Sequence, residues 1–160
     1  MNGHFELSTK VIQNAKAKGL MLATAESCTG GMIAASLTDV AGSSAVFDRG
    51  FVTYSYPSKI ETLNVSEEML AEYGAVSEPV ARQMAFGALS TSNADLAIAV
   101  TGVAGPGADG DKAEGLVWFA LASARGVEAR EVNFGAIGRD KVRMATVETA
   151  LNWLSDKISG

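Results

Sequence analysis

The chain has 160 residues, of which 48% are hydrophobic, and its formal net charge at pH 7 is −5. This length suits one ordinary domain, so we expect residues 1–160 to form a single domain. The acidic balance argues against a nucleic-acid partner, because binding to a phosphate backbone needs a basic face.

The N-terminal segment and the apolar runs give information on the cellular location of the protein. No uninterrupted apolar run approaches the roughly 18 residues of a membrane span, and residues 1–10 lack the features of a signal peptide. We therefore expect a cytoplasmic protein with no membrane partner. Charged residues make up 19% of the chain, somewhat below the usual quarter. This modest charge suggests that some surface is buried against another copy, so we expect a homo-oligomer, with a dimer favoured.

Histidine and cysteine are scarce, and this limits the chemistry. The chain has one histidine, His4, and one cysteine, Cys28. A zinc site of the usual Cys/His kind cannot be assembled from them. A Ser-His-Asp triad would have to recruit His4 from the terminal segment. Any hydrolytic reaction must therefore move protons with a lysine, a tyrosine or a carboxylate.

Hydrophobic periodicity and end signals predict strands that alternate with helices. In chain order we expect a helix over 5–18, a strand over 20–25, a helix over 32–37, a strand over 46–54, helices starting near 55 and 66, a helix over 77–89, a strand over 96–100, a hairpin of strands 116–124 and 127–134, and a helix over 139–158. This order predicts the α/β class: a single layered domain whose mixed β-sheet is flanked by helices.

The segment Glu26-Ser27-Cys28-Thr29-Gly30-Gly31 joins the first predicted strand to a helix. Ser27 or Thr29 can cap that helix. Each glycine in a helical turn costs about 1 kcal/mol against alanine, so the pair suggests that something approaches the backbone closely. Bare N–H groups at a helix start suit an anion or an oxyanion. A plain capped turn is the alternative, and either Ser27 or Cys28 could be the nucleophile.

Lys59 falls in or near the first turn of the helix that follows Tyr54. A solvated surface lysine is the usual case. A lysine that acts as a general base must instead be neutral, and lowering its pKa from 10.4 to about 7–8 needs roughly 4 kcal/mol. The helix dipole supplies at most about 1 kcal/mol, so desolvation would have to do most of this. A serine–lysine mechanism therefore requires Lys59 to be largely buried.

Three other features are candidate binding elements. A glycine-rich loop over 101–110 follows a buried strand, where ligands collect in open α/β sheets. Arg139 and Arg143 share a helix face and form either a solvated pair or a phosphate clamp. The Gly42-Ser43-Ser44 segment offers amide and hydroxyl donors, or it is a plain turn.

Taken in order, these motifs resemble a known family. Ala25 to Gly31, Gly42-Ser43-Ser44, Tyr54 with Lys59, residues 74–77 (Gly-Ala-Val-Ser) and 101–106 (Thr-Gly-Val-Ala-Gly-Pro) match the CinA C-terminal-domain family of nicotinamide-mononucleotide deamidases. The resemblance runs from about residue 5 to 157 and is to the stand-alone form. It implies hydrolysis of the nicotinamide carboxamide to nicotinate mononucleotide and ammonia in pyridine nucleotide salvage, without cofactor or metal.

The resemblance also implies roles for particular residues. The family's serine nucleophile, tyrosine and lysine fall on Ser27, Tyr54 and Lys59. We expect Lys59 to take the Ser27 proton, with Tyr54 as a relay. Amides near Gly30 and Gly31 would hold the oxyanion, and the ribose phosphate would lie among Thr101, Gly102 and Arg139. The expected contacts to this small nucleotide substrate are Thr29, Gly30, Gly31, Gly42, Ser43, Thr101, Gly102 and Arg139.

Residues 107–115 depart from the family pattern, in which a glycine-rich stretch usually leads to Lys-Pro-Val-Gly. Here they read Gly-Ala-Asp-Gly-Asp-Lys-Ala-Glu-Gly. Two other functions remain open. One is an amidase for another small amide, and the other is a non-enzymatic nucleotide-binding regulatory module of the competence/damage-inducible type.

Overall fold

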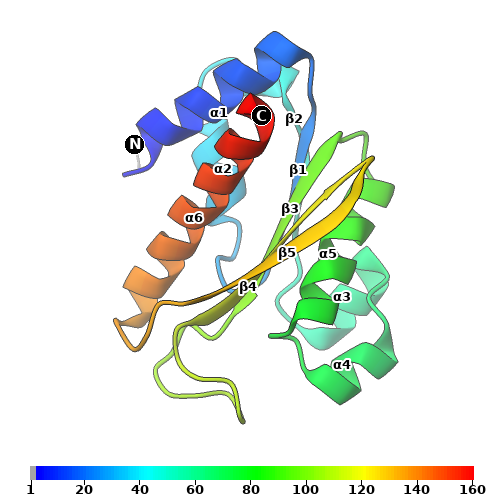
Figure 1. Ribbon diagram of the computed structural model, residues 1–160, viewed down its shortest axis with the longest axis vertical. Helices are drawn as coiled ribbons and strands as arrows, with labels where there is room; N and C mark the ends of the chain where they lie inside the picture. Colours follow the sequence, from blue (N-terminus) through cyan, green and yellow to red (C-terminus); the bar gives the residue numbers. More distant parts are fainter. Residues whose placement is uncertain (1–2) are drawn as a thin grey trace.

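A five-stranded mixed sheet lies between two layers of helices in the computed structural model, which describes residues 3–160 (Figure 1). The first three strands in the chain are parallel, and the last two run antiparallel to their neighbours. The order across the sheet is β2 (Phe47–Val52), β1 (Leu22–Glu26), β3 (Leu96–Gly102), β4 (Leu116–Ser123) and β5 (Gly126–Asn133). The predicted α/β class with a mixed sheet is confirmed.

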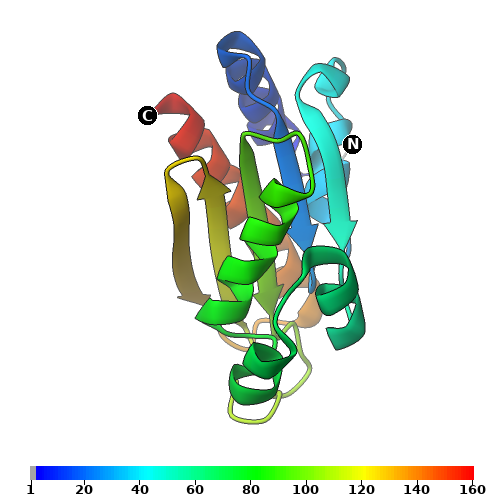
Figure 2. The ribbon, with the colours of Figure 1, turned by 90° about the vertical axis from the view of Figure 1, so that its right-hand side faces the viewer.

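Each face of the sheet is covered by helices (Figures 1 and 2). One layer holds α1 (Phe5–Lys18), α2 (Met32–Thr38) and α6 (Arg139–Ser159), and the other holds α3 (Tyr56–Leu63), α4 (Glu67–Tyr73) and α5 (Glu78–Ser90). A short 3-10 turn, Ser43–Ala45, precedes β2. Within residues 3–160, none of the helices is long and apolar enough to span a membrane.

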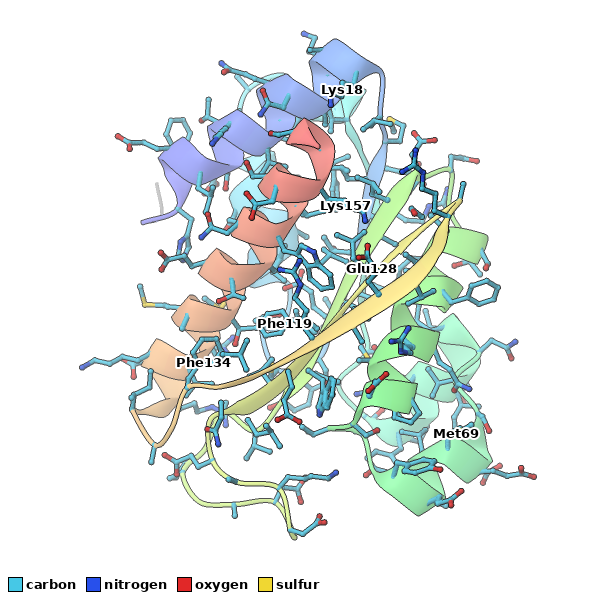
Figure 3. All side chains as sticks on the ribbon, in the orientation of Figure 1. Lys18, Met69, Phe119, Glu128, Phe134 and Lys157 are labelled. Atoms are coloured by element: carbon cyan, nitrogen blue, oxygen red, sulfur yellow. The ribbon has the colours of Figure 1, made fainter. Side chains whose placement is uncertain are left out.

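The two faces of the sheet carry side chains of different size. Toward α1 and α6 the core is built from large residues such as Leu22, Ile98 and Phe119. Phe119 meets Phe134 edge to face, with ring centroids 6.5 Å apart (Figure 3). Toward α5 the strands present alanines instead: Ala23, Ala25, Ala97, Ala99, Ala120 and Ala122. Small side chains on this face let α5 pack close to the sheet, and α3 packs against α5.

The topology brings several chain segments to one edge of the sheet. The parallel strands β1, β2 and β3 all end there, and the antiparallel β4 begins there. The loop between β3 and β4 and the start of α6 lie at the same edge, which is the lower end in Figure 2. Ligands of open α/β sheets bind beyond the carboxyl ends of the strands. This edge is therefore where the structure places its candidate site.

We predict that Gly87→Ala destabilises the contact between α5 and α3. A Cβ at Gly87 would lie 2.0 Å from the carbonyl oxygen of Leu63, at the end of α3. The resulting overlap with backbone should cost about 1–3 kcal/mol and exceed the ~1 kcal/mol that alanine gains in helix propensity. Chemical denaturation measures the loss.

The neighbouring variant Phe86→Ala is the control for this prediction. Its side chain is 60% exposed on the same helix, so its stability should change by no more than about 0.5 kcal/mol. A Gly87→Ala protein as stable as the wild type would show that the two helices are not held by this close approach.

Candidate active site

Ser27 and Lys59 meet at the carboxyl edge of the sheet. Ser27 is the first residue after β1, and its N–H donates to the Val100 carbonyl of β3 (3.1 Å). Lys59 lies near the start of α3, whose N-terminus is fixed by a reciprocal capping box between Ser55 and Ser58. The Lys59 Nζ is 2.9 Å from the Ser27 Oγ. The Lys59 side chain is 0% exposed, so the expectation that this lysine is buried is confirmed.

Burial also sets the protonation of Lys59. Desolvation lowers the pKa of this lysine from 10.5 to about 8. Its Nζ donates to the carbonyl oxygens of Thr53 (2.6 Å) and Tyr54 (3.4 Å). A neutral amine has two N–H groups and one lone pair. With both N–H groups on these carbonyls, the lone pair is left for the Ser27 hydroxyl.

Cys28 is a poor rival for the role of nucleophile. Its thiol is buried, and desolvation raises the thiol pKa from 9.0 to about 11. The thiolate is the reactive form of cysteine, so this side chain stays protonated and unreactive near neutral pH. The Ser27 Oγ, by contrast, lies 2.9 Å from the Lys59 Nζ, whose pKa is lowered. Of the two neighbours, the geometry and the pKa values favour Ser27.

Glu26 organises the turn that carries Ser27, a role that sequence reasoning missed. Its buried carboxylate accepts the Thr29 hydroxyl (2.6 Å) and the N–H groups of Ile33 (2.8 Å) and Ala34 (3.0 Å). Glu26 therefore caps α2, and the expectation that Ser27 or Thr29 caps it is wrong. An acidic residue directly before a strand-to-helix turn was the available signal, since a carboxylate is stabilised at a helix N-terminus.

Gly30 and Gly31 set the backbone geometry of the turn after Ser27. Gly30 and Gly31 both have positive φ, 59° and 104°, a conformation that disfavours side chains. The Gly30 N–H donates to the Ser27 carbonyl (3.1 Å), so it is not free to hold an oxyanion. Cβ atoms built at these positions would face Arg143 and Val52. Thr29 likewise points its hydroxyl at Glu26 and is fully buried.

Arg143 reaches the same turn from α6. Its Nε donates to the Cys28 carbonyl (3.0 Å) and its Nη2 to the Thr29 carbonyl (3.3 Å). The paired phosphate clamp that the helical spacing suggested is therefore not formed with Arg139. Arg143 instead fixes the backbone just after Ser27.

A cleft of about 310 Å³ opens beside the Ser27–Lys59 pair. Of the expected site residues, it is lined by Ser27, Tyr54, Lys59, Thr101, Gly102 and Arg139. The Thr101 hydroxyl donates to the Ala75 carbonyl (2.9 Å), which joins the loop before α5 to β3. The loop at Ala75 and Val76 forms another part of the wall. These two residues belong to the Gly-Ala-Val-Ser motif of the family resemblance, but they were not among the expected substrate contacts.

Gly42 and Ser43 lie at the opposite edge of the sheet. They precede β2, at its amino end, where Leu22 of β1 begins its pairing with Phe47. Ser27 follows the carboxyl end of β1. Since β1 and β2 are parallel, the structure does not bring Gly42 and Ser43 to the cleft.

Tyr54 and Arg139 stand together at the cleft. Tyr54 is 60% exposed, and its hydroxyl accepts a hydrogen bond from the Arg139 Nη2 (2.9 Å). The Arg139 Nη1 donates to the carbonyl of Gly105 in the glycine-rich loop (2.7 Å). Arg139 thus bridges the end of β2 and the loop after β3.

The unusual segment 107–115 closes on itself. Asp109 and Lys112 exchange backbone hydrogen bonds of 2.9 Å in each direction. The Glu114 carboxylate accepts the Gly107 N–H, and its side chain lies against Gly105, where a Cβ would come within 2.7 Å of it. Glu114 therefore holds the loop that carries the Gly105 carbonyl.

Comparison with known proteins finds relatives that match most of this chain. The nicotinamide-nucleotide amidohydrolase PncC of Escherichia coli strain K12 is 51% identical over 152 residues, which are 93% of this chain and 91% of that protein. A CinA-like protein of Geobacter sulfurreducens is 48% identical over 98% of this chain, which is only 38% of that longer protein.

A solved structure agrees with these sequence matches. The crystal structure of competence/damage inducible protein CihA from Agrobacterium tumefaciens is similar with a TM-score of 0.94 and 48% identity, covering 100% of this chain and 98% of that one. The family model described as the CinA C-terminal domain matches residues 4–158. The chain therefore belongs to the CinA C-terminal domain family.

Proposed function

We propose that this chain hydrolyses the carboxamide of nicotinamide mononucleotide, releasing nicotinate mononucleotide and ammonia in pyridine nucleotide salvage. The observation that carries the proposal is the 2.9 Å contact between the Lys59 Nζ and the Ser27 Oγ beside a cleft. The 51% identical relative from Escherichia coli, a nicotinamide-nucleotide amidohydrolase, supports this substrate.

Acylation in this mechanism begins with proton transfer within the pair. Neutral Lys59 accepts the Ser27 proton while the Ser27 Oγ bonds to the amide carbon of the substrate. The protonated Lys59 then gives its proton to the amide nitrogen, the carbon–nitrogen bond breaks, and ammonia leaves. The product of this half-reaction is an ester between Ser27 and the nicotinoyl group.

The oxyanion needs a donor other than Gly30, and the Cys28 N–H is the best placed. A trans peptide points its C=O and N–H in opposite directions. The Ser27 carbonyl is turned toward the Gly30 N–H, so the Cys28 N–H of the same peptide points away from that side. Within residues 3–160 no oxygen accepts this N–H, and Cys28 lines the cleft. On the other side of Cys28, Arg143 donates a hydrogen bond to the Cys28 carbonyl.

Deacylation reuses the same base. Lys59, neutral again after ammonia departs, accepts a proton from water as the water oxygen attacks the ester carbon. Lys59 then returns that proton to the Ser27 Oγ when the ester bond breaks. The acid product loses its remaining proton to solvent and leaves as the carboxylate, and the Ser27–Lys59 pair is restored.

An ammonia-release assay on nicotinamide mononucleotide tests the proposal. Release of one ammonia per nicotinate mononucleotide formed supports it. Faster turnover of a different small amide would assign the chain to another amidase. Nucleotide binding without ammonia release would assign it to the regulatory class.

We predict that Ser27→Ala abolishes turnover, because it removes the oxygen that forms the acyl ester. Cys28→Ala should retain activity within about threefold, because the Cys28 thiol is held protonated and is not the nucleophile. Both are measured as kcat for ammonia release. The assignment would be reversed by an active Ser27→Ala protein beside an inactive Cys28→Ala protein.

We predict that kcat/KM rises with pH through a pKa of about 8 and then levels off. The base works only when Lys59 is neutral, so the rate should fall about tenfold for each pH unit below that pKa. Lys59→Arg keeps the positive charge but does not deprotonate near neutrality. It should lose about 100- to 10,000-fold in kcat. Near-normal turnover by Lys59→Arg would mean that the charge, and not the base, is what the reaction needs.

A further inference from the structure

The hydroxyl of Tyr54 makes no hydrogen bond to Ser27 or Lys59, whereas the backbone of Tyr54 does contact Lys59. Lys59 reaches Ser27 directly, and its contact with Tyr54 is to the backbone carbonyl at 3.4 Å. The hydroxyl instead accepts from Arg139 on α6. A proton can therefore pass from Ser27 to Lys59 directly, without a relay through Tyr54.

Arg139 is held at two points and still has donors to spare. Its Nη1 donates to the Gly105 carbonyl (2.7 Å) and its Nη2 to the Tyr54 hydroxyl (2.9 Å). A guanidinium carries five N–H groups, so three remain for a ligand. Such a planar set of donors matches the oxygens of a phosphate. Arg139 also lines the cleft that holds Ser27.

We infer that Tyr54 is a positioning residue, whose hydroxyl fixes the Arg139 guanidinium for the phosphate of a nucleoside monophosphate. This inference rests on the proposed function. Holding an exposed, flexible arginine before the ligand arrives lowers the entropy cost of binding. Tyr54 then acts on the affinity for phosphate and leaves the chemistry at Ser27 unchanged.

Kinetics on two substrates test this role. Tyr54→Phe removes only the hydroxyl. With nicotinamide mononucleotide, KM should rise about 5- to 20-fold, because the ligand must then order the Arg139 guanidinium itself, while kcat stays within about twofold. With nicotinamide riboside, which lacks the phosphate, neither constant should change. Tyr73→Phe is the matched control, since Tyr73 is an exposed tyrosine on α4 outside the cleft.

A double-mutant cycle adds a second readout. If Tyr54 acts through Arg139, then Tyr54→Phe should add no further rise in KM to an Arg139→Lys protein. Additive effects would show that the two residues act separately and would overturn the inference. A fall in kcat on both substrates, with KM unchanged, would restore Tyr54 to the proton path. Unchanged kinetics on both substrates would also overturn the inference.

Binding measurements separate this inference from the proposed function. Titration calorimetry on the Ser27→Ala protein gives the Kd of nicotinamide mononucleotide without turnover. Adding Tyr54→Phe to that protein should weaken binding about 5- to 20-fold, as in the kinetic test. This comparison stands even if the wild type releases no ammonia, and equal Kd values would contradict the role of Tyr54.

Discussion

The proposed chemistry depends on keeping one amine, that of Lys59, out of water and next to one hydroxyl, that of Ser27. Lys59 has no exposed surface, and its pKa falls from 10.5 to about 8. At pH 7 about one lysine in ten is then neutral, against fewer than about one in a thousand for an unperturbed lysine. The same shift costs about 3 kcal/mol of stability at neutral pH. Below about pH 8 the cost is complete, because Lys59 is protonated both folded and unfolded. Between about pH 8 and pH 10.5 the folded chain has released that proton while the unfolded chain still holds it. The free energy of unfolding therefore rises with pH until the cost has disappeared.

The rest of the molecule places and supports that contact from both faces of the sheet. On one face, the alanine-rich surface and Gly87 let α5 and α3 approach closely, and α3 carries Lys59. On the other face, Arg143 of α6 donates hydrogen bonds to the carbonyls of the two residues after Ser27. Glu26, at the end of β1, ties the same turn to α2. Ser27, the proposed nucleophile, is thus held between elements that are distant in sequence, and this keeps its Oγ 2.9 Å from the Lys59 Nζ.

Sequence reasoning predicted the elements and the central pair but not the supporting contacts. The strand and helix patterns are local, so residues such as those of α1 and α6 could be assigned within a residue or two. The requirement that Lys59 be buried followed from the energy needed to neutralise it. The capping role of Glu26 had a local signal, its place directly before the strand-to-helix turn. The partners of Arg143 could not be predicted, because they depend on how α6 packs against that turn. Gly42 and Ser43 were placed in the site because of their amide and hydroxyl donors and the family resemblance, and the parallel strand order puts them at the other edge.

The protonation of Lys59 can be measured directly. A nuclear magnetic resonance titration with isotope-labelled lysine, assigned by comparison with Lys59→Met, would follow the ε-methylene signals of each lysine against pH. We predict that Lys59 titrates at about 8, well below the usual lysine value of about 10.4. A Lys59 that stayed protonated to pH 10 would contradict it, because the amine could not then serve as the base for Ser27.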